Sequence, residues 1–377
     1  MSEHSCRACR GTEGHLVLDL GEQPACDYFP AAGDPGPDPV HPLQMWLCSS
    51  CGLAQLVADP TVPEEPRGAE PAALVAQATD AVHRIAAGGL LAGAHRVAEY
   101  GSPHGGSWLG LLADHGLTPV ADGDRADIVL DCFGLMHAAD QAGALAERAA
   151  RLAPGGVLLL QYHALDTIIR LGQWNALRHG HYAYYSTTAL TAMLAAQSLR
   201  PVAAWSFELY GGTVLLAARR DDEPPAEPAD QLTGKPAGEL GALLARDAAA
   251  GVRDPAAFAG LQASMQDCAQ SLHAWLAAQR AAGRAVLGYG AASRAVALLR
   301  SAGADRALLP AVADASPAKQ GLRMPGTDIP VIDPAQLVRR RPDDVLLFLS
   351  DLMPEVRASF PEVEASGGGW VDVETLR

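Results

Sequence analysis

Four of the seven cysteines stand in two closely spaced pairs near the N-terminus. Cys6 and Cys9 form one Cys-x-x-Cys pair, and Cys48 and Cys51 form the second. Each such turn presents two thiolates to one ion, and a tetrahedral zinc ion takes four soft ligands. Because sulfur would fill all four positions, the ion would hold the fold together and leave no open position for catalysis. We therefore predict a structural zinc site; the alternative is four cysteines without a metal.

Histidines and tyrosines gather in a second segment, HGHYAYY. It contains His179, His181, Tyr182 and Tyr184, and a further histidine, His137, follows an apolar strand pattern upstream. Imidazoles titrate near neutrality and suit the removal and return of a proton. Phenols can donate to a developing oxyanion. Taken alone, the segment also fits a surface loop with aromatic anchors.

A glycine turn, E-Y-G-S-P-H-G, follows the apolar run at 96–101. It places Glu99, Gly101 and Gly105 between an expected strand and an expected helix. A strand, a glycine turn and a helix N-terminus can cradle a nucleotide-type cofactor. The alternative is a tight turn without a ligand.

Strand and helix patterns alternate around these groups. Helices are expected near 73–92, 108–116, 141–156 and 186–200, and strands near 96–101, 126–134, 157–163 and 211–220. This alternation predicts a layered α/β sheet. Residues 237–282 look mainly helical, and 284–299 start a second, smaller α/β unit with a strand, a glycine turn and a helix. Two linkers rich in proline and acidic residues, 59–72 and 221–230, separate the parts. We therefore divide the chain into 1–60, 61–222 and 223–377.

Composition limits the classes of partner. The chain has 377 residues, of which 49% are hydrophobic, so it can bury a sizeable core and is not disordered as a whole. A net charge of −15 argues against nucleic acid or an anionic membrane as partner. No apolar run approaches the ~20 residues of a membrane span, and residues 1–15 lack the apolar core of a signal peptide. We expect a cytoplasmic monomer or homodimer with a small-molecule substrate.

Several longer motifs carry a family resemblance. GYGAASRAVALL (288–299), DASPAKQGLRMPGTDIPVIDP (314–334) and LGQWNALRHGHYAYYSTTAL (171–190) resemble segments of the sugar C-methyltransferases of actinobacterial antibiotic pathways. Those enzymes act on nucleotide-linked deoxyketosugars with S-adenosylmethionine (SAM). The resemblance implies an α/β protein with an N-terminal four-cysteine zinc lobe, a central Rossmann-like domain of the SAM-methyltransferase type and a C-terminal Rossmann-like domain.

The resemblance also implies roles for individual residues. His181, His179, His137 and Tyr184 would be catalytic. The cofactor would contact Glu99, Gly101, Gly105 and Asp122, the last through the ribose hydroxyls. The residues implied in substrate binding are Tyr182, Tyr210, Gly288, Tyr289, Gly290, Asp314 and Lys319.

Departures from the family pattern gather in the cofactor half. The family's Asn-Asp in the glycine turn is Pro103-His104 here, and PEEPRGAEPA (63–72) replaces a tyrosine-rich segment that covers the cofactor. Residues 117–129 are too few for a second strand, a helix and a third strand beside adenine. In the histidine segment, a tyrosine has become Arg178 and a glutamate has become Gly180. We therefore expect SAM binding to be weakened or lost.

Three hypotheses of function follow. The first is an enzyme of secondary metabolism that isomerises, eliminates or cyclises a carbonyl compound by histidine acid–base chemistry, without methyl transfer. Its substrate would be a nucleotide-linked sugar or an intermediate derived from a polyketide or peptide. The second is a genuine SAM-dependent C-methyltransferase with an unusual cofactor pocket. The third is a non-catalytic partner of another biosynthetic enzyme.

Overall fold

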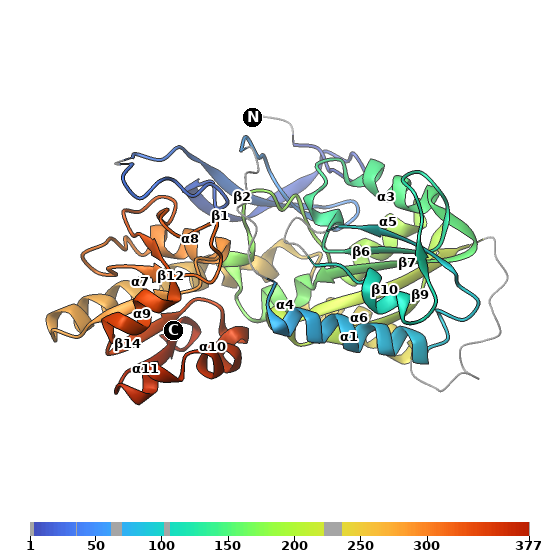
Figure 1. Ribbon diagram of the computed structural model, residues 1–377. Helices are drawn as coiled ribbons and strands as arrows, with labels where there is room; N and C mark the ends of the chain where they lie inside the picture. Colours follow the sequence, from blue (N-terminus) through green and yellow to red (C-terminus); the bar gives the residue numbers. More distant parts are fainter. Residues whose placement is uncertain (1–3, 35, 62–69, 102–105, 222–235, 377) are drawn as a thin grey trace.

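Three β-sheets organise the part of the protein that the structure describes. The computed structural model describes residues 4–34, 36–61, 70–101, 106–221 and 236–376. Figure 1 shows the N-terminal sheet in blue lying across the top of the other two parts, with the central sheet and the C-terminal sheet on opposite sides. Among the described residues, no helix has the length and apolarity needed to cross a membrane.

The N-terminal sheet is antiparallel and takes its last strand from a distant part of the chain. Its order is β1-β2-β3-β8. The strands are β1 (Gly14–Pro24), β2 (Val40–Cys48), β3 (Ala54–Leu56) and β8 (Ala183–Tyr184). Ala54 of β3 pairs with Tyr184 of β8. The predicted histidine segment is thus attached through its backbone to the lobe that carries the four cysteines.

The central sheet has six strands in the order β5-β4-β6-β7-β10-β9. They are β4 (Arg96–Tyr100), β5 (Thr118–Pro119), β6 (Ala126–Cys132), β7 (Leu152–His163), β9 (Leu199–Phe207) and β10 (Thr213–Arg220). The strands from β5 to β7 are parallel, and β10 runs antiparallel to both β7 and β9. The apolar runs of β6 and β7 are buried on both faces, as expected for central parallel strands.

Six helices belong to this central part. They are α1 (Ala72–Ala87), α2 (Leu109–Ala113), α3 (Gln141–Ala150), α4 (Leu165–Arg170), α5 (Thr187–Ala195) and α6 (Pro236–Ala250). Although α6 follows the second linker, it packs against β9, α4 and α5 rather than against the C-terminal sheet. The central part therefore includes a helix that the sequence analysis placed in the 223–377 segment.

The central sheet is shortened at the position that the sequence predicts, residues 117–129. Strand β5 has only two residues, and residues 120–125 lead directly from it to β6. No further strand or helix occurs between β5 and β6, a stretch that is described throughout. The sheet therefore ends at β5, next to β4.

The C-terminal sheet is fully parallel, with the order β13-β12-β11-β14-β15. Its strands are β11 (Val286–Tyr289), β12 (Val312–Ala313), β13 (Val331–Ile332), β14 (Asp344–Leu347) and β15 (Gly369–Asp372). The helices are α7 (Ala259–Ala281), α8 (Ser293–Ser301), α9 (Pro334–Arg340), α10 (Met353–Ser359) and α11 (Pro361–Ala365). The strand order reverses between β11 and β14, which makes a ligand-binding crevice at their carboxyl ends.

Buried contacts join the N-terminal lobe to the C-terminal part. One apolar cluster contains residues of β1 and β2, the segment before His179 and the helices α7 and α8. A buried ion pair crosses the same boundary, with Arg323 Nη2 2.5 Å from Asp38 Oδ1. Removing one partner of such a pair costs far more than removing an exposed pair, because the remaining charge is buried alone. The lobe is therefore fixed against both other parts.

Some element boundaries differ from those expected. The helix expected at 141–156 ends at Ala150, and β7 begins at Leu152, ahead of the Pro154-Gly155-Gly156 sequence that looked like a helix stop. The helix expected at 186–200 ends at Ala195 and is followed by β9, which the sequence analysis missed. Its Ser186 N-cap is confirmed, since the side chain accepts a hydrogen bond from Ala189 N.

Candidate functional site

The four paired cysteines converge on one point. The four sulfur atoms of Cys6, Cys9, Cys48 and Cys51 all lie within 4.8 Å of one another. Cys6 Sγ is 3.5 Å from Cys51 Sγ, and Cys9 Sγ is 3.6 Å from Cys48 Sγ. Tetrahedral zinc with Zn–S bonds of about 2.3 Å separates its sulfurs by roughly 3.8 Å. The cysteine cluster therefore fits a zinc ion with four thiolate ligands.

Backbone hydrogen bonds stabilise the turn from Cys6 to Cys9. The backbone amides of Ala8 and Cys9 donate to Cys6 Sγ. A hydrogen bond from Cys51 and these backbone donors lower the pKa of Cys6 to about 5, which favours the thiolate that zinc requires. Cys26 lies outside the cluster and is buried near the backbone carbonyl of His179.

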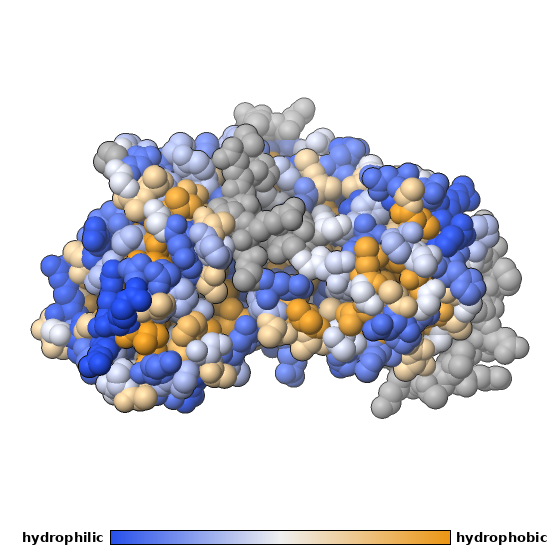
Figure 2. Space-filling model, in the orientation of Figure 1, coloured by the Kyte–Doolittle hydropathy of each residue, from blue (hydrophilic) through white to orange (hydrophobic). Residues whose placement is uncertain are grey.

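A cavity of about 200 Å³ lies between the central sheet and the C-terminal sheet. The carboxyl ends of β4, β6 and β7 contribute Glu99, Cys132 and His163 to its wall. The start of α8 contributes Ser293 and Arg294, and the histidine segment contributes Arg178, His181 and Tyr184. Most of the outer surface seen in Figure 2 is hydrophilic, with apolar side chains in scattered patches. The cavity brings together predicted residues of the glycine turn and of the histidine segment, among them Glu99, His181 and Tyr184.

His181 is the predicted histidine that lines this cavity. It is 7% exposed, and Arg178 Nε lies 2.7 Å from its Nε2. The ring of His137 packs edge-on against it, with the ring centroids 4.6 Å apart. The structure therefore brings two of the three predicted histidines together. Arg178 also donates from Nη1 to Ser293 Oγ, which connects this pair to α8.

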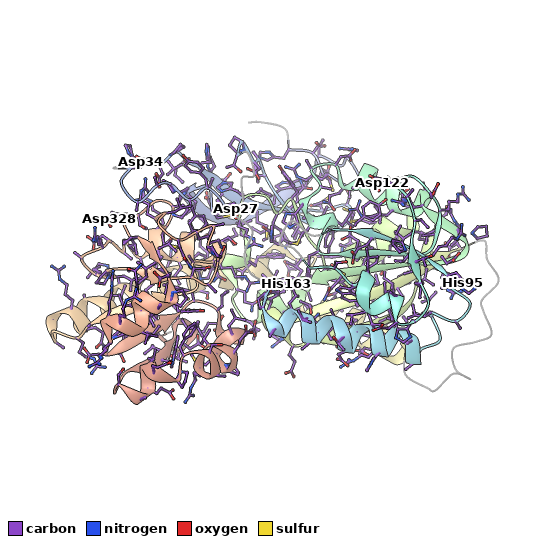
Figure 3. The ribbon with its side chains drawn as sticks, in the orientation of Figure 1. Asp27, Asp34, His95, Asp122, His163 and Asp328 are labelled. Atoms are coloured by element: carbon purple, nitrogen blue, oxygen red, sulfur yellow. The ribbon has the colours of Figure 1, made fainter. Side chains whose placement is uncertain are left out.

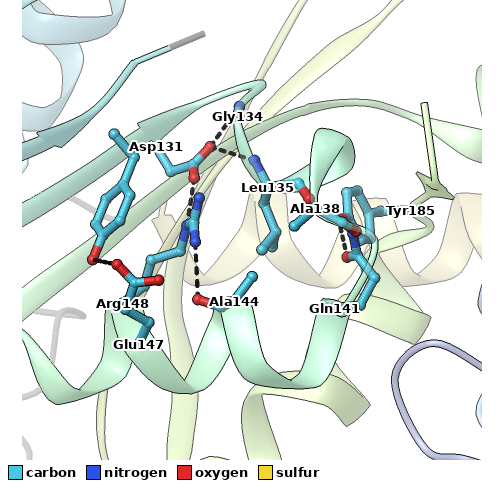
Figure 4. Close-up of polar contacts among 10 residues, drawn as sticks. Asp131, Gly134, Leu135, Ala138, Gln141, Ala144, Glu147, Arg148 and Tyr185 are labelled. Carbon is cyan, nitrogen blue, oxygen red and sulfur yellow. Dashed lines mark hydrogen bonds and ion pairs between the residues drawn. The ribbon is translucent and has the colours of Figure 1, made fainter. Parts of the chain in front are cut away.

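A buried network positions the turn that carries His137 (Figure 4). Asp131, at the end of β6, accepts hydrogen bonds from the backbone amides of Gly134 (2.7 Å) and Leu135 (2.9 Å). Its other oxygen lies 2.5 Å from Arg148 Nε, and the two side chains are 1% and 8% exposed. Gln141 Nε2 then donates to the carbonyl of Leu135, and Tyr185 donates to the Gln141 amide oxygen. These contacts fix the short helix Leu135–His137 beside the histidine segment.

His179, the third predicted histidine, faces the N-terminal lobe rather than the cavity. His179 is 2% exposed, its Nε2 is 3.4 Å from the carbonyl of Pro42 in β2, and its ring packs edge-on against that of His41. Burial lowers its pKa. Gly180, between the two histidines, has φ +83°, a conformation that favours glycine. The reversal of direction at Gly180 separates His179 from His181.

The predicted tyrosines also differ in position. Tyr184 lines the cavity, but its hydroxyl accepts a hydrogen bond from the backbone amide of Arg178 at 3.1 Å. Burial raises its pKa, so the phenol stays neutral. Tyr182 packs under the guanidinium of Arg7 on the N-terminal lobe and does not line the cavity. Tyr210 lines the cavity with φ +57° and stacks on Arg294.

The predicted cofactor residues are only partly assembled. Glu99 and Gly101 line the cavity, while Gly105 lies outside the described residues. The Glu99 carboxylate already accepts hydrogen bonds from Ser107 Oγ and Trp108 N, each at 2.6 Å. Asp122 is exposed and does not line the cavity, and Figure 3 shows it far from His163, which does. Of the four predicted cofactor residues, the structure thus places Glu99 and Gly101 at the cavity and Asp122 away from it.

The C-terminal candidates have mostly structural positions. A Cβ on Gly288 would lie 2.9 Å from Phe348 and from Val312, so the strand needs glycine there for packing. Tyr289 is buried against Phe360 and Trp370, on the side away from the cavity.

The loop after β11 is held by its own contacts. Gly290 donates its amide to Ala313, and Asp314 accepts hydrogen bonds from Ala291 N and Ser316 N. Lys319 is 7% exposed, lines the cavity and donates to the Ala291 carbonyl. Of the five C-terminal candidates, Lys319 is the one whose side chain reaches the cavity wall.

The sequence analysis missed several residues of the cavity. Arg294 lies one residue into α8, with its Nη2 3.5 Å from His163 Nδ1. Burial and the charge of Arg294 lower the pKa of His163 to about 3, so this histidine is neutral. Gln161 and Ser293 also line the cavity. Arg294 comes four residues after Gly290 of the glycine turn, near the start of α8, and this position could have indicated it. His163 and Gln161 show no signal beyond their place at a strand end.

Comparisons with known protein families cover almost all the described residues. Residues 6–64 match the family described as "Putative zinc binding domain", and residues 72–204 match "Methyltransferase domain". Residues 208–373 match "C-methyltransferase C-terminal domain". The three matches follow one another in the order that the fold shows. These matches support the resemblance of the chain to the C-methyltransferase family. This result confirms the family resemblance, the three-part α/β fold and the assignment of the four cysteines to a zinc-binding lobe.

The individual relatives that match this chain are distant. The C-methyltransferase NovU of Streptomyces niveus is 24% identical over 261 residues, which cover 69% of this chain and 58% of NovU. An O-methyltransferase family protein from Burkholderia thailandensis is 18% identical, covering 40% of this chain and 57% of its own, with a TM-score of 0.31. The 1,6-didemethyltoxoflavin-N1-methyltransferase of the same organism is 19% identical, covering 45% and 96%, with a TM-score of 0.27. These structural scores are too low to carry an argument.

Proposed function

We propose that this protein is an enzyme of secondary metabolism that uses the C-methyltransferase scaffold for proton transfer on a carbonyl compound, without transfer of a methyl group. One observation carries the proposal. Residues 120–125 join β5 directly to β6, and Asp122 is exposed outside the cavity. The sheet therefore offers neither the strand beside adenine nor the ribose carboxylate that the family pattern calls for.

The proton-transfer half of the site is assembled. Arg178 donates to Nε2 of His181, so this nitrogen carries a lone pair and the imidazole is neutral. A substrate carbonyl that takes over the hydrogen bond from Arg178 releases that lone pair to act as a base. His181 then removes a proton from the carbon beside the carbonyl, and Arg178 stabilises the enolate oxygen. Return of the proton to the opposite face of the same carbon inverts its configuration, an isomerisation that consumes no other reactant.

His137 and His179 have different parts in this scheme. His137 touches the ring of His181 and can pass the proton onward. His179 faces the N-terminal lobe and takes no part in the proton transfer. The pair His181 and His179 therefore provides an active-site variant and a matched control from one segment.

Deuterium exchange tests the proposal directly. Zinc-loaded protein is incubated in D2O without SAM, with a nucleotide-linked deoxyketosugar or with pyruvate, and exchange at the carbon beside the carbonyl is followed by NMR. We expect catalysed exchange that falls by about a hundredfold or more in His181→Gln and persists in His179→Gln. Exchange that is equal in wild type and His181→Gln would exclude His181 as the base and favour a non-catalytic partner role.

A second candidate is SAM-dependent C-methylation, in which the same enolate would serve as the carbon nucleophile. It is favoured by the place of the cavity at the carboxyl ends of β4 and β6, with Glu99, Gly101 and Trp108 in its wall. Titration calorimetry with SAM and S-adenosylhomocysteine separates the two candidates. Micromolar binding, together with a methylated product, would overturn the proton-transfer proposal. Absence of binding up to millimolar concentration supports it.

A further inference from the structure

Three cationic side chains line the cavity beside His181. They are Arg178, Arg294 and Lys319. Lys319 is tied down by the carbonyl of Ala291 and lies over the ring of Phe29. Arg178 reaches Ser293 as well as His181. Two carboxylates, Glu70 and Glu99, also line the cavity, and Glu99 already accepts hydrogen bonds from Ser107 and Trp108. Positive side chains therefore outnumber negative ones in the wall, in a protein whose net charge is −15.

Arg294 has no carboxylate close to it. Among the described residues, no Asp or Glu oxygen lies within 4.0 Å of its guanidinium. Its near neighbours are His163 Nδ1 at 3.5 Å and the Tyr210 ring at 5.3 Å. Asp351 acts on it from further away and already accepts a hydrogen bond from the Tyr210 amide at 2.7 Å. Burial and the positive charge of Arg178 lower the pKa of Arg294.

Two like charges in a partly enclosed cavity repel each other more strongly than they would in water. An anion placed between them would remove this repulsion and accept hydrogen bonds from both guanidinium groups. Two departures of the histidine segment from the family pattern both make this site more positive. Arg178 stands in place of a neutral tyrosine, and Gly180 stands in place of a glutamate.

Further hydrogen-bond donors face the same space. Gln161 lines the cavity, and its buried amide nitrogen has no hydrogen-bond partner in the described part of the structure. The first turn of α8, with Ala292 and Ser293, also borders the cavity, and a helix N-terminus favours negative charge. A ligand rich in acceptor oxygens would satisfy this set of donors.

We propose that Arg178 and Arg294 bind an anionic group of the substrate, a carboxylate or a phosphate, next to His181. The substrate class is then a small carbonyl compound with an anionic group near the reacting carbon. This assignment rests on the proposed function, because it places that group beside the base. The anion also anchors the carbon acid within reach of His181 and strengthens the electrostatic stabilisation of the enolate.

Binding of simple anions tests the assignment without any turnover. The probes are inorganic phosphate and pyruvate, compared with chloride at the same ionic strength and with methyl pyruvate, which is uncharged. Zinc-loaded full-length protein is followed by calorimetry and by its Tm. We expect phosphate, pyruvate or both to bind and raise Tm beyond chloride, with methyl pyruvate much weaker. Binding of phosphate alone assigns a phosphate ester, and binding of pyruvate alone assigns an oxo acid.

Variants identify the site of binding. Arg294→Gln should weaken binding by about tenfold or more, since it removes a charge-assisted hydrogen bond to the anion. Arg294→Lys keeps the charge and should retain part of the affinity. This variant still tests the site if Arg294→Gln does not fold properly. Arg200→Gln, on the surface beside Asp221, is the control for net charge. Equal binding by wild type and a folded Arg294→Gln would overturn the proposal, as would no binding of either anion beyond chloride.

The two proposals fail separately. Anion binding that depends on Arg294, without deuterium exchange, would sustain the anion site and remove the proton-transfer function. Exchange that depends on His181, without anion binding, would do the opposite.

Discussion

Arg178 Nε lies 2.7 Å from Nε2 of His181, in a cavity that both residues line. A guanidinium can only donate, so this nitrogen of His181 must accept. Arg178 Nε also lies 3.3 Å from Nδ1 of the same ring, but the shorter contact at Nε2 favours the lone pair there and the proton on Nδ1. His163 has the opposite tautomer. Its Nδ1 faces the guanidinium of Arg294 and must accept, so its proton is on Nε2.

The tautomers of these two histidines can be measured. In long-range 15N NMR spectra of histidine-labelled protein, we expect His181 as the Nδ1–H tautomer and His163 as the Nε2–H tautomer. Arg178→Met removes the donor and should let His181 populate both forms, while His163 is unchanged. A spectrum of His181 that is the same in wild type and Arg178→Met would show that Arg178 does not control the imidazole.

His163 should remain neutral at physiological pH. Burial and Arg294 lower its pKa to about 3 in the folded protein, against about 6.5 in an unfolded chain. Its contribution to stability is therefore complete above pH 6.5 and is lost as the pH falls toward 3, because the unfolded chain binds the proton more readily. We expect no change in its NMR shift between pH 5 and 8. A change in this shift within that range would contradict the prediction.

Removal of zinc should disturb the histidine segment as well as the lobe that binds the metal. The backbone of β3 pairs with β8, so loosening the lobe frees Ala183 and Tyr184. After chelation, or in Cys48→Ser, we expect a lower Tm and faster hydrogen exchange at both 44–57 and 181–185. Cys26→Ala leaves the four ligands in place and should keep its metal. Unchanged exchange at 181–185 after full loss of zinc would contradict this coupling.

The buried pair of Asp131 and Arg148 should be important for stability. Asp131→Asn leaves Arg148 buried beside a neutral amide, and breaking such a pair costs about 3–5 kcal/mol. Glu364→Gln breaks an exposed pair with Arg357 and should cost less than about 1 kcal/mol. Denaturant unfolding compares the two variants. Equal costs would mean that the Asp131 network does not hold the turn before His137.

Asp247 should make the protein less stable at neutral pH than its hydrogen bonds alone suggest. Burial raises its pKa to about 6, although Thr188 donates to it twice. The folded state therefore binds the proton more tightly than the unfolded chain. The resulting stability is fully present below about pH 4 and is lost as the pH rises through about 6.

Asp247→Asn can accept the same hydrogen bonds without a charge. We expect it to exceed the wild type in unfolding free energy at pH 8, by at most about 3 kcal/mol, with the gain shrinking as the pH falls through 6. Asp267→Asn, at an exposed position on α7, is the control for the change from carboxylate to amide. A gain of the same size at pH 4 and pH 8 would exclude titration of Asp247 as the cause.

Sequence patterns predicted what depends on local spacing. The cysteine pairs, the alternation of strands and helices and the short stretch at 117–129 all belong to this class. The direction of His179 was out of reach, because it depends on the positive φ of Gly180 and on packing against β2. Gly288 looked like a ligand contact, but its role is packing under Phe348 and Val312.

The wall of the cavity could not be assembled from the sequence. Glu99, His163, His181 and Arg294 come from separate elements, and only the docking of the two sheets brings them together. Strand β9 was missed because it follows α5 closely and contains Pro201, which weakens the strand pattern.

The pairing of β3 with β8 also has a consequence for synthesis of the chain. The residues at 54–56 leave the ribosome long before those at 183–184, and the cavity wall is complete only after Leu349 has emerged. The edge of β3 that pairs with β8 therefore has no partner strand while much of the central domain is synthesised. Such a delay exposes a strand edge to wrong partners, and pairing between distant segments is slow. Early capture of zinc by the cysteine pairs would hold this edge in shape until its partner arrives.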